Sequence, residues 1–164
     1  MPCTVKESIP VVGMPHTAGL ASRRCIVTTD DALAVRRLRD AGAIVLGVTN
    51  TAELCLGIES TNSVHGRTRN PYDERRVSGG SSGGEGAAIG SGGSPFGLGG
   101  DTGGSIRIPS FYCGVFGHKP SPGLVPANES VPSLAGDAEL DTLETLGPMA
   151  RRATDLMPLL RILA

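Results

Sequence analysis

A tract rich in glycine and serine near the middle of the chain holds the residues best suited to chemistry. It runs from Gly79 to Ser110 and reads GGSSGGEGAAIGSGGSPFGLGGDTGGSIRIPS. Glycines let a loop curve so that successive N–H groups converge on the oxygen that gains charge during acyl transfer. The N–H groups of Thr102, Gly103, Gly104 and Ser105 could converge in this way. Because Ser105 directly follows the glycine pair, it is the leading candidate for a nucleophile.

Two other interpretations of the tract are weaker. A phosphate-binding loop needs a glycine followed by Lys and then Ser or Thr, and the tract lacks this string; Gly84-Glu85-Gly86 also does not extend to a dinucleotide-binding fingerprint. A flexible linker would be uniformly polar, whereas this tract carries apolar insertions such as Ile89 and Phe96. The tract therefore indicates an ordered loop structure built around an acyl-transfer site.

Several strings in the correct order resemble the amidase-signature family. They are GGSSGGEG, GGDTGGSIRIPSFYCGVFGHKPSPG, VKE at residues 5 to 7 and NPYD at residues 70 to 73. Within this family, Glu85 in the first string and HKPSPG from His118 are most similar to the fatty-acid amide hydrolase branch. The resemblance covers nearly the whole chain, and the separation between Ser81 and Ser105 fits it too.

The resemblance implies a catalytic triad in which Ser105 is the nucleophile, Ser81 is a bridging serine that follows a cis peptide bond, and Lys6 is the base. A serine hydroxyl is a weak nucleophile until a base takes its proton. A lysine can be that base only where burial and hydrogen bonds disfavour its charged form. Ser81 can donate to one neighbour and accept from the other, so it can relay a proton between Lys6 and Ser105.

The same resemblance assigns supporting roles around the triad. Backbone N–H groups would stabilise the oxyanion, three side chains would hold the loop, and Cys55 would lie near the backbone of the nucleophile; no metal and no organic cofactor is implied. The oxyanion donors are Thr102, Gly103 and Gly104, and the loop-holding residues are Ser82, Asp101 and Arg107.

Each of these residues also has a plainer interpretation when taken alone. Lys6 would usually be a surface lysine, and Asp101 could simply cap the short helix that starts near Ser105. Arg107 could pair with a surface carboxylate, and Glu85 could be an acidic residue at a helix N-terminus. The triad is preferred because three separate segments of the sequence agree on it.

The implied reaction is hydrolysis of a carboxamide through an acyl-enzyme, on a small, lipid-like substrate such as an N-acylethanolamine or a primary fatty amide. One alternative is the amidase subunit of the glutamyl-tRNA amidotransferase, which works in a partner complex; its string usually continues with small residues, so Glu85 argues against it. A second alternative is a catalytically inactive fragment. Family members are usually several hundred residues long, so residues 1–164 are expected to form a single, truncated catalytic core.

Composition limits the remaining classes. The chain has 39% hydrophobic and 19% charged residues and a formal net charge of -1, which is typical of a soluble globular protein and excludes a basic surface for nucleic acid. The four cysteines lack a CxxC pair, so we expect them to be reduced and mostly buried. Neither a secretory signal nor an apolar run of about 20 residues is present, which predicts an intracellular protein, cytoplasmic or membrane-associated through segments missing here. A homodimer is left open.

Hydrophobic patterning predicts alternating strands and helices. We expect a strand over residues 3–6, a helix from an Asp30 cap through Asp40 with Gly42 as its stop, and a strand over 43–48 that is buried on both faces. A short helix over 51–56 and a loop over 59–78 follow.

The second half of the chain continues this alternation. Further strands are expected over 95–99 and 115–118, with a turn of helix over 105–112 between them. The chain then ends in an amphipathic helix over 154–163 that Pro158 interrupts. The whole predicts an α/β fold with a twisted, mixed β-sheet flanked by helices, incomplete in this chain, with the Gly/Ser loops at one edge.

Overall fold

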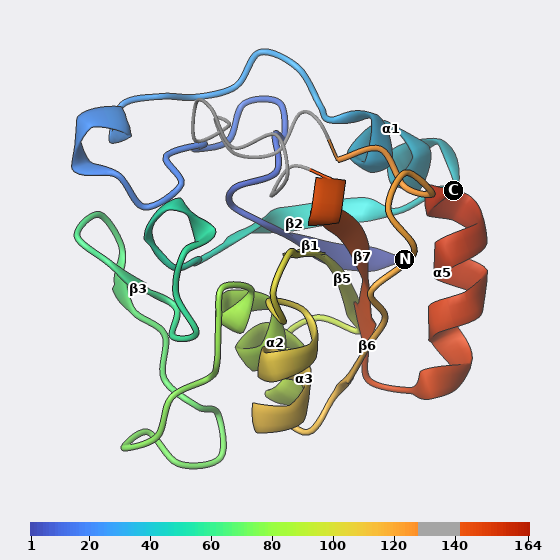
Figure 1. Ribbon diagram of the computed structural model, residues 1–164. Helices are drawn as coiled ribbons and strands as arrows, with labels where there is room; N and C mark the ends of the chain where they lie inside the picture. Colours follow the sequence, from blue (N-terminus) through green and yellow to red (C-terminus); the bar gives the residue numbers. More distant parts are fainter. Residues whose placement is uncertain (128–141) are drawn as a thin grey trace.

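The computed structural model describes residues 1–127 and 142–164, and a mixed β-sheet lies at the centre of the described part (Figure 1). Its strand order is β2-β1-β5-β7-β6. The first three strands run parallel, whereas β7 pairs antiparallel with both β5 and β6. The strand bounds are Pro2–Lys6 for β1, Ile44–Thr49 for β2, Phe96–Asp101 for β5, Phe116–Gly117 for β6 and Thr145–Ala150 for β7. The predicted mixed sheet is confirmed.

Helices cover both faces of this sheet (Figure 1). Helices α1 (Leu33–Asp40) and α5 (Leu156–Leu163) pack on one face, and α2 (Gly83–Gly90) and α3 (Arg107–Tyr112) pack on the other. Long loops, shown at the left of Figure 1, connect β1 to β2 and β2 to β5. They contain the 3₁₀ turns η1 (Ala21–Arg23) and η2 (Glu53–Cys55) and the short hairpin of β3 (Thr61–Asn62) and β4 (Gly66–Arg67); a third 3₁₀ turn, η3 (Ala153–Asp155), precedes α5.

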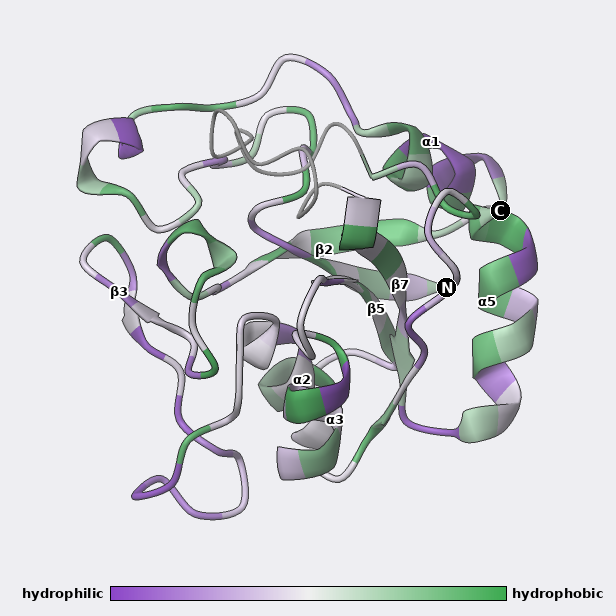
Figure 2. Cartoon of the chain, in the orientation of Figure 1, coloured by the Kyte–Doolittle hydropathy of each residue, from purple (hydrophilic) through white to green (hydrophobic). Residues whose placement is uncertain are grey.

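Side chains along β1 alternate between the two faces, as a strand requires. Cys3 and Val5 join the apolar core formed with α1 and α5, while Thr4 contacts Glu85 of α2 on the opposite face. Figure 2 shows hydrophobic colouring along the central strands and hydrophilic colouring along the loop that carries β3. Lys6 is in phase with Thr4, so the alternation directs the candidate base toward α2.

Close packing between α2 and the sheet explains the local excess of glycine. A Cβ atom at Gly97 of β5 would overlap the Glu85 carboxylate, and one at Gly84 of α2 would overlap the carbonyl oxygen of Asn50. The sequence did not predict α2 as an element, because glycine is a poor helix former. Its contacts with β1, β5 and α3 stabilise the helix despite that low propensity.

Three details of the predicted elements are wrong. Helix α1 begins at Leu33 without a side-chain cap, because Asp30 lies outside it; Gly42 does follow its end, with a φ of +87°. Strand β2 is not buried on both faces, because Ile44 and Leu46 are 63% and 55% exposed; it lies at the edge of the described sheet. Pro158 does not interrupt α5, because it lies in the first turn, where a missing N–H breaks no helical hydrogen bond.

Strand β7 was not predicted from the sequence. It is buried along its whole length, and it pairs with β5 from Phe96↔Ala150 to Asp101↔Thr145. Its sequence, TLGPMA, contains Pro148, which usually argues against a central strand. This strand holds β5 in place between two partners, and β5 leads directly into the candidate oxyanion loop.

All four cysteines are free thiols, and only Cys3 and Cys113 are buried; Cys25 is exposed and Cys55 is partly exposed. The expectation of mostly buried cysteines therefore holds for two of them. Among the residues that the structure describes, no helix is both long and apolar enough to cross a bilayer.

Candidate active site

Lys6 and Ser81 are in direct contact in the interior of the protein. Lys6 is the last residue of β1 and is 2% exposed, and its Nζ donates a hydrogen bond of 2.7 Å to Ser81 Oγ. The neighbouring strand β5 has a glycine at position 100, where a Cβ would lie 3.6 Å from Nζ. The structure thus brings together the first two residues of the predicted triad.

Ser81 is held by its backbone as well as by its side chain. The peptide bond between Gly80 and Ser81 is cis, as the sequence prediction expected. The carbonyl of Ser81 accepts hydrogen bonds from Ser60 Oγ at 2.9 Å and from the N–H of Ala52 at 3.3 Å. At Gly80 only a glycine fits, since a Cβ would lie 2.7 Å from the backbone nitrogen of Glu59.

Ser105 lies beside this pair and is linked to it through Ser82. The N–H of Ser82 donates to the carbonyl of Ser105 at 3.1 Å, and Ser82 Oγ donates to the carbonyl of Gly100 at 3.1 Å. Ser105 is partly exposed, as a group that must meet a substrate needs to be. Within the described residues no hydrogen bond joins the hydroxyls of Ser81 and Ser105. The two serines are instead linked by the backbone hydrogen bond from Ser82 to Ser105.

Asp101 organises the loop that carries Ser105. Its buried carboxylate accepts hydrogen bonds from the N–H groups of Gly104, at 2.8 Å, and Ile106, at 3.0 Å, and both oxygens bind the guanidinium of Arg107. Burial alone would raise the pKa of Asp101, but the bonds from Arg107, Ile106 and Gly104 outweigh it and lower that pKa below its ordinary value. Asp101 and Arg107 therefore form one ionic clamp, and the surface pair considered for Arg107 is instead a bond to a buried carboxylate.

The loop N–H groups differ in their availability. The N–H of Gly104 already binds Asp101, whereas those of Thr102, Gly103 and Ser105 donate to no group in the described part of the chain. Gly103 is exposed and Thr102 is partly exposed. N–H groups without an acceptor beside a serine are available to stabilise an oxyanion.

Glu85 is a buried residue whose surroundings the sequence analysis missed. It lies in the first turn of α2, as expected of an acid at a helix N-terminus, but it is fully buried instead of facing solvent. Its carboxylate accepts hydrogen bonds from Thr4 Oγ1 at 2.7 Å and Thr49 Oγ1 at 2.6 Å. Neither threonine carries a local signal in the sequence, because both belong to ordinary strand patterns.

Ser60 is a second missed residue. Besides binding the Ser81 carbonyl, its Oγ accepts a hydrogen bond of 2.7 Å from the N–H of Gly83, so it spans the turn between the cis bond and α2. It lies in a segment interpreted only as loop. Cys55 belongs to η2, and the residue before η2, Ala52, donates its N–H to the carbonyl of Ser81. The described residues contain no group of three or more side chains able to hold a metal ion.

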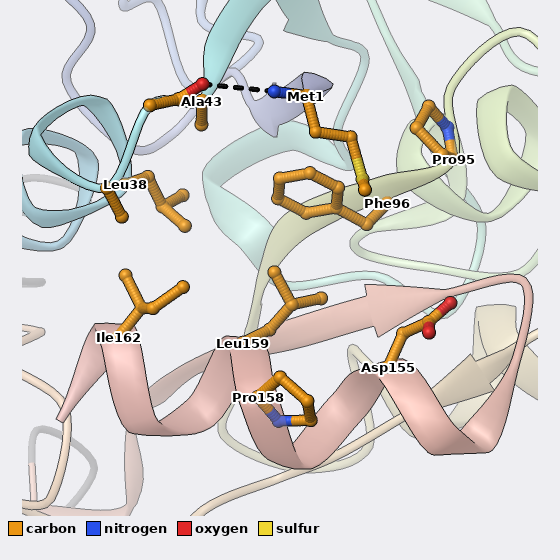
Figure 3. Close-up of a pocket in the computed structure, with 11 residues that line it drawn as sticks. Met1, Leu38, Ala43, Pro95, Phe96, Asp155, Pro158, Leu159 and Ile162 are labelled. Atoms are coloured by element: carbon orange, nitrogen blue, oxygen red, sulfur yellow. Dashed lines mark hydrogen bonds between the residues drawn. The ribbon is translucent and has the colours of Figure 1, made fainter.

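An apolar pocket of about 270 Å³ lies elsewhere, at the amino end of β1 (Figure 3). Met1, just before β1, and Leu38 of α1, Phe96 of β5, and Leu159 and Ile162 of α5 point into it. Lys6 and Asp101 stand at the carboxyl ends of β1 and β5, so this pocket and the triad lie at opposite ends of the sheet. The pocket belongs to the apolar core and not to the candidate active site.

Comparison with known proteins identifies the family of this chain. The family model described as Amidase matches residues 1–164. Fatty-acid amide hydrolase 2 of Homo sapiens is 49% identical over 164 residues, covering 100% of this chain and 30% of that protein; fatty-acid amide hydrolase 2-B of Danio rerio is 52% identical, covering 100% and 31%. The crystal structure of one subunit of glutamyl-tRNA(Gln) amidotransferase from Thermotoga maritima superposes with a TM-score of 0.90 at 36% identity, covering 99% of this chain and 35% of that one.

This chain therefore spans about a third of the length of these relatives. The family match extends over every residue of it, and the similar structure has the same mixed sheet flanked by helices. The chain belongs to the amidase family.

Proposed function

We propose that this protein is a serine hydrolase that cleaves carboxamides, with Ser105 as the nucleophile, Ser81 as the proton relay and Lys6 as the base. The observation that carries the proposal is the hydrogen bond of 2.7 Å between the buried Lys6 Nζ and Ser81 Oγ. The N–H of the adjacent residue, Ser82, donates a hydrogen bond to the carbonyl of Ser105, and this bond supports a position of Ser105 next to Ser81.

The proton would pass along the triad in both directions. Ser105 Oγ forms a bond to the amide carbon while its proton moves to Ser81 and the proton of Ser81 moves to Lys6. In the next step Lys6 returns a proton through Ser81 to the leaving nitrogen, and the C–N bond breaks. Water then cleaves the acyl-enzyme and regenerates the free serine.

The loop from Thr102 to Gly104 would stabilise the negative oxygen of the tetrahedral intermediate. The free N–H groups of Thr102 and Gly103 support this role, and the N–H of Gly104 would act while also bound to Asp101. The Asp101–Arg107 clamp fixes the curvature of this loop, so the donors need little reorganisation during the reaction.

A fatty-acid amide is the substrate class that the comparisons favour. The two relatives named fatty-acid amide hydrolase 2 are 49% and 52% identical to this chain, compared with 40% to 42% for the related amidotransferase A subunits. Glu85, which lies in the same GGSSGGEG string as Ser81 and is buried, supports the sequence resemblance to the fatty-acid amide hydrolase branch together with HKPSPG from His118. The leaving group would be ammonia or a small amine.

Hydrolysis of defined amides by the full-length protein tests this proposal. We expect release of free fatty acid from a long-chain primary amide or an N-acylethanolamine, and little release of ammonia from glutamine. Ser105→Ala should lower the rate by at least about a thousandfold, because the attacking oxygen is lost. Ser91→Ala, at an exposed serine just after α2, is the matched control and should leave the rate unchanged.

Two outcomes would contradict the proposal. Full activity in Ser105→Ala would exclude this serine as the nucleophile. Hydrolysis of glutamine in preference to fatty amides would assign the chain to the amidotransferase type of reaction instead.

A further inference from the structure

We propose that Glu85 is a positioning residue for the reaction, and that the charge on its buried carboxyl group controls how readily Lys6 accepts the proton of Ser81. This inference rests on the triad proposed above. It concerns a residue that takes no part in the proton relay itself and whose carboxylate is hydrogen-bonded to Thr4 and Thr49.

The position of Glu85 couples it to both strands around Lys6. Thr4, which donates to one carboxylate oxygen, lies two residues before Lys6 and therefore on the same face of β1. Thr49, which donates to the other oxygen, is the residue of β2 that pairs with Lys6 in the parallel register. The carboxyl group thus sits over the backbone that carries the base.

The sheet leaves space for this carboxyl group at a specific residue. Thr4 pairs in register with Gly97 of β5, and a Cβ at Gly97 would overlap Glu85 Oε2. Glu85 also follows Ser81 by about one helical turn, so α2 carries the carboxyl group while the residues just before the helix carry the relay serine. Helix α2 and the residues just before it therefore carry both Glu85 and the serine that binds Lys6.

The carboxyl group can change its charge near neutral pH. Burial raises the pKa of Glu85 to about 7, against the opposing effects of the hydrogen bonds from Thr49 and Thr4 and of the positive charge of Lys6. An ionised Glu85 and the positive charge of Lys6 attract each other, and protonation of Glu85 removes that attraction.

Other titratable groups near Glu85 stay fixed in this range. The thiol of Cys3 on β1 has its pKa raised to about 11 by burial and by the charge of Glu85, and burial raises the pKa of the Cys113 thiol, which lies beside α2, to about 11. Arg151, at the end of β7, reaches the carbonyl of Ile89 in the last turn of α2, and Asp101 of β5 is paired with Arg107. Lys6 is therefore the group whose charge is coupled to that of Glu85.

The test is the pH dependence of the rate at which a fluorophosphonate probe labels the full-length protein. The acidic limb of that profile reports the loss of the free amine that activates Ser105 through Ser81. Three variants are compared with the wild type. Glu85→Gln carries no charge at position 85 at any pH, whereas Glu85→Asp keeps a carboxyl group that can ionise. Thr49→Val removes one hydrogen bond to the Glu85 carboxylate.

We expect the acidic limb of Glu85→Gln to move to lower pH by about one pH unit, because the negative charge that favours the ammonium form is gone. Thr49→Val should move the limb in the same direction by less, since it favours the neutral carboxyl group. Glu85→Asp should keep the limb near that of the wild type. A purely structural role would lower the plateau rate and leave the limb in place.

Coincident acidic limbs for the wild type and Glu85→Gln would overturn the inference while leaving the proposed function intact. If circular dichroism shows that Glu85→Gln does not fold, Thr49→Val decides, and an unmoved limb in that variant overturns the inference. Failure of the folded wild type to be labelled at Ser105 would instead contradict the proposed function.

Discussion

The sheet face covered by α2 and α3 buries polar side chains beside a small apolar cluster, whereas the face covered by α1 and α5 buries mainly apolar side chains. Under α2 lie Lys6, Ser81 and Glu85, each of them at most 2% exposed and each hydrogen-bonded to a named partner. Under α1 and α5 lie aliphatic side chains such as Val5 and Leu98, next to the apolar pocket of Figure 3.

This difference shows how one short sheet accommodates both a stable core and polar chemistry. Burying polar groups is costly unless every one of them has a partner, and the face under α2 provides partners at short range. Glycines on β5 and α2 bring the backbones close enough for those bonds. The other face is packed with aliphatic side chains and borders the apolar pocket.

The largest effect is expected from a methyl group on the polar face. Gly97→Ala places a Cβ against the Glu85 carboxylate and 3.0 Å from Thr4 Oγ1. We expect a loss of roughly 3–4 kcal/mol in the free energy of unfolding, from overpacking and from disrupted buried hydrogen bonds. Urea denaturation of the full-length protein measures this loss.

Gly47→Ala on β2 is the matched control, since a Cβ there meets nothing within 4 Å. It should change the free energy of unfolding by no more than about 0.5 kcal/mol. Equal effects of the two substitutions would remove the distinction between a tightly packed polar face and the rest of the sheet.

The next effect is a pH dependence that only the polar face should show. Because burial raises the pKa of Glu85 from an ordinary 4.5 to about 7, the folded protein binds its proton more tightly than the unfolded chain. The contribution of Glu85 to stability is therefore fully present below pH 4.5 and declines as the pH rises to about 7, by about 3 kcal/mol in total. Measured as wild type minus Glu85→Gln, the difference in free energy of unfolding should fall over this range and stay level above it.

Leu159→Ala supplies the contrast from the apolar face. Leu159 is 9% exposed and lines the pocket, so its truncation should reduce the free energy of unfolding by about 2 kcal/mol at every pH. A difference between wild type and Glu85→Gln that rises with pH, or one as flat as that for Leu159→Ala, would contradict the account of Glu85.

The sequence predicted the parts of the fold that depend on local pattern. The strands at β1, β5 and β6, helix α5 and the stop after α1 all appear where hydrophobic periodicity and Gly42 indicate. Helix α2 and strand β7 escaped prediction for the same physical reason. Glycines and Pro148 have poor local propensity, and only packing against neighbouring strands makes them regular.

The candidate site divides in a similar way. The contact between Lys6 and Ser81, the cis bond before Ser81 and the anchoring of the loop by Asp101 and Arg107 followed from recognisable strings in the sequence. The burial of Glu85 and the contacts of Ser60 could not be predicted. They depend on which strand pairs with which, and a single sequence without relatives carries no signal for such long-range pairing.

The site to which a fluorophosphonate attaches tests the central claim most directly. We predict that peptide mass spectrometry of the labelled full-length protein will locate the adduct on Ser105, and that Lys6→Met and Ser81→Ala will slow its formation by at least about a hundredfold. An adduct on another residue, or an unchanged labelling rate in folded Lys6→Met, would contradict the proposal that a buried lysine activates Ser105 through Ser81.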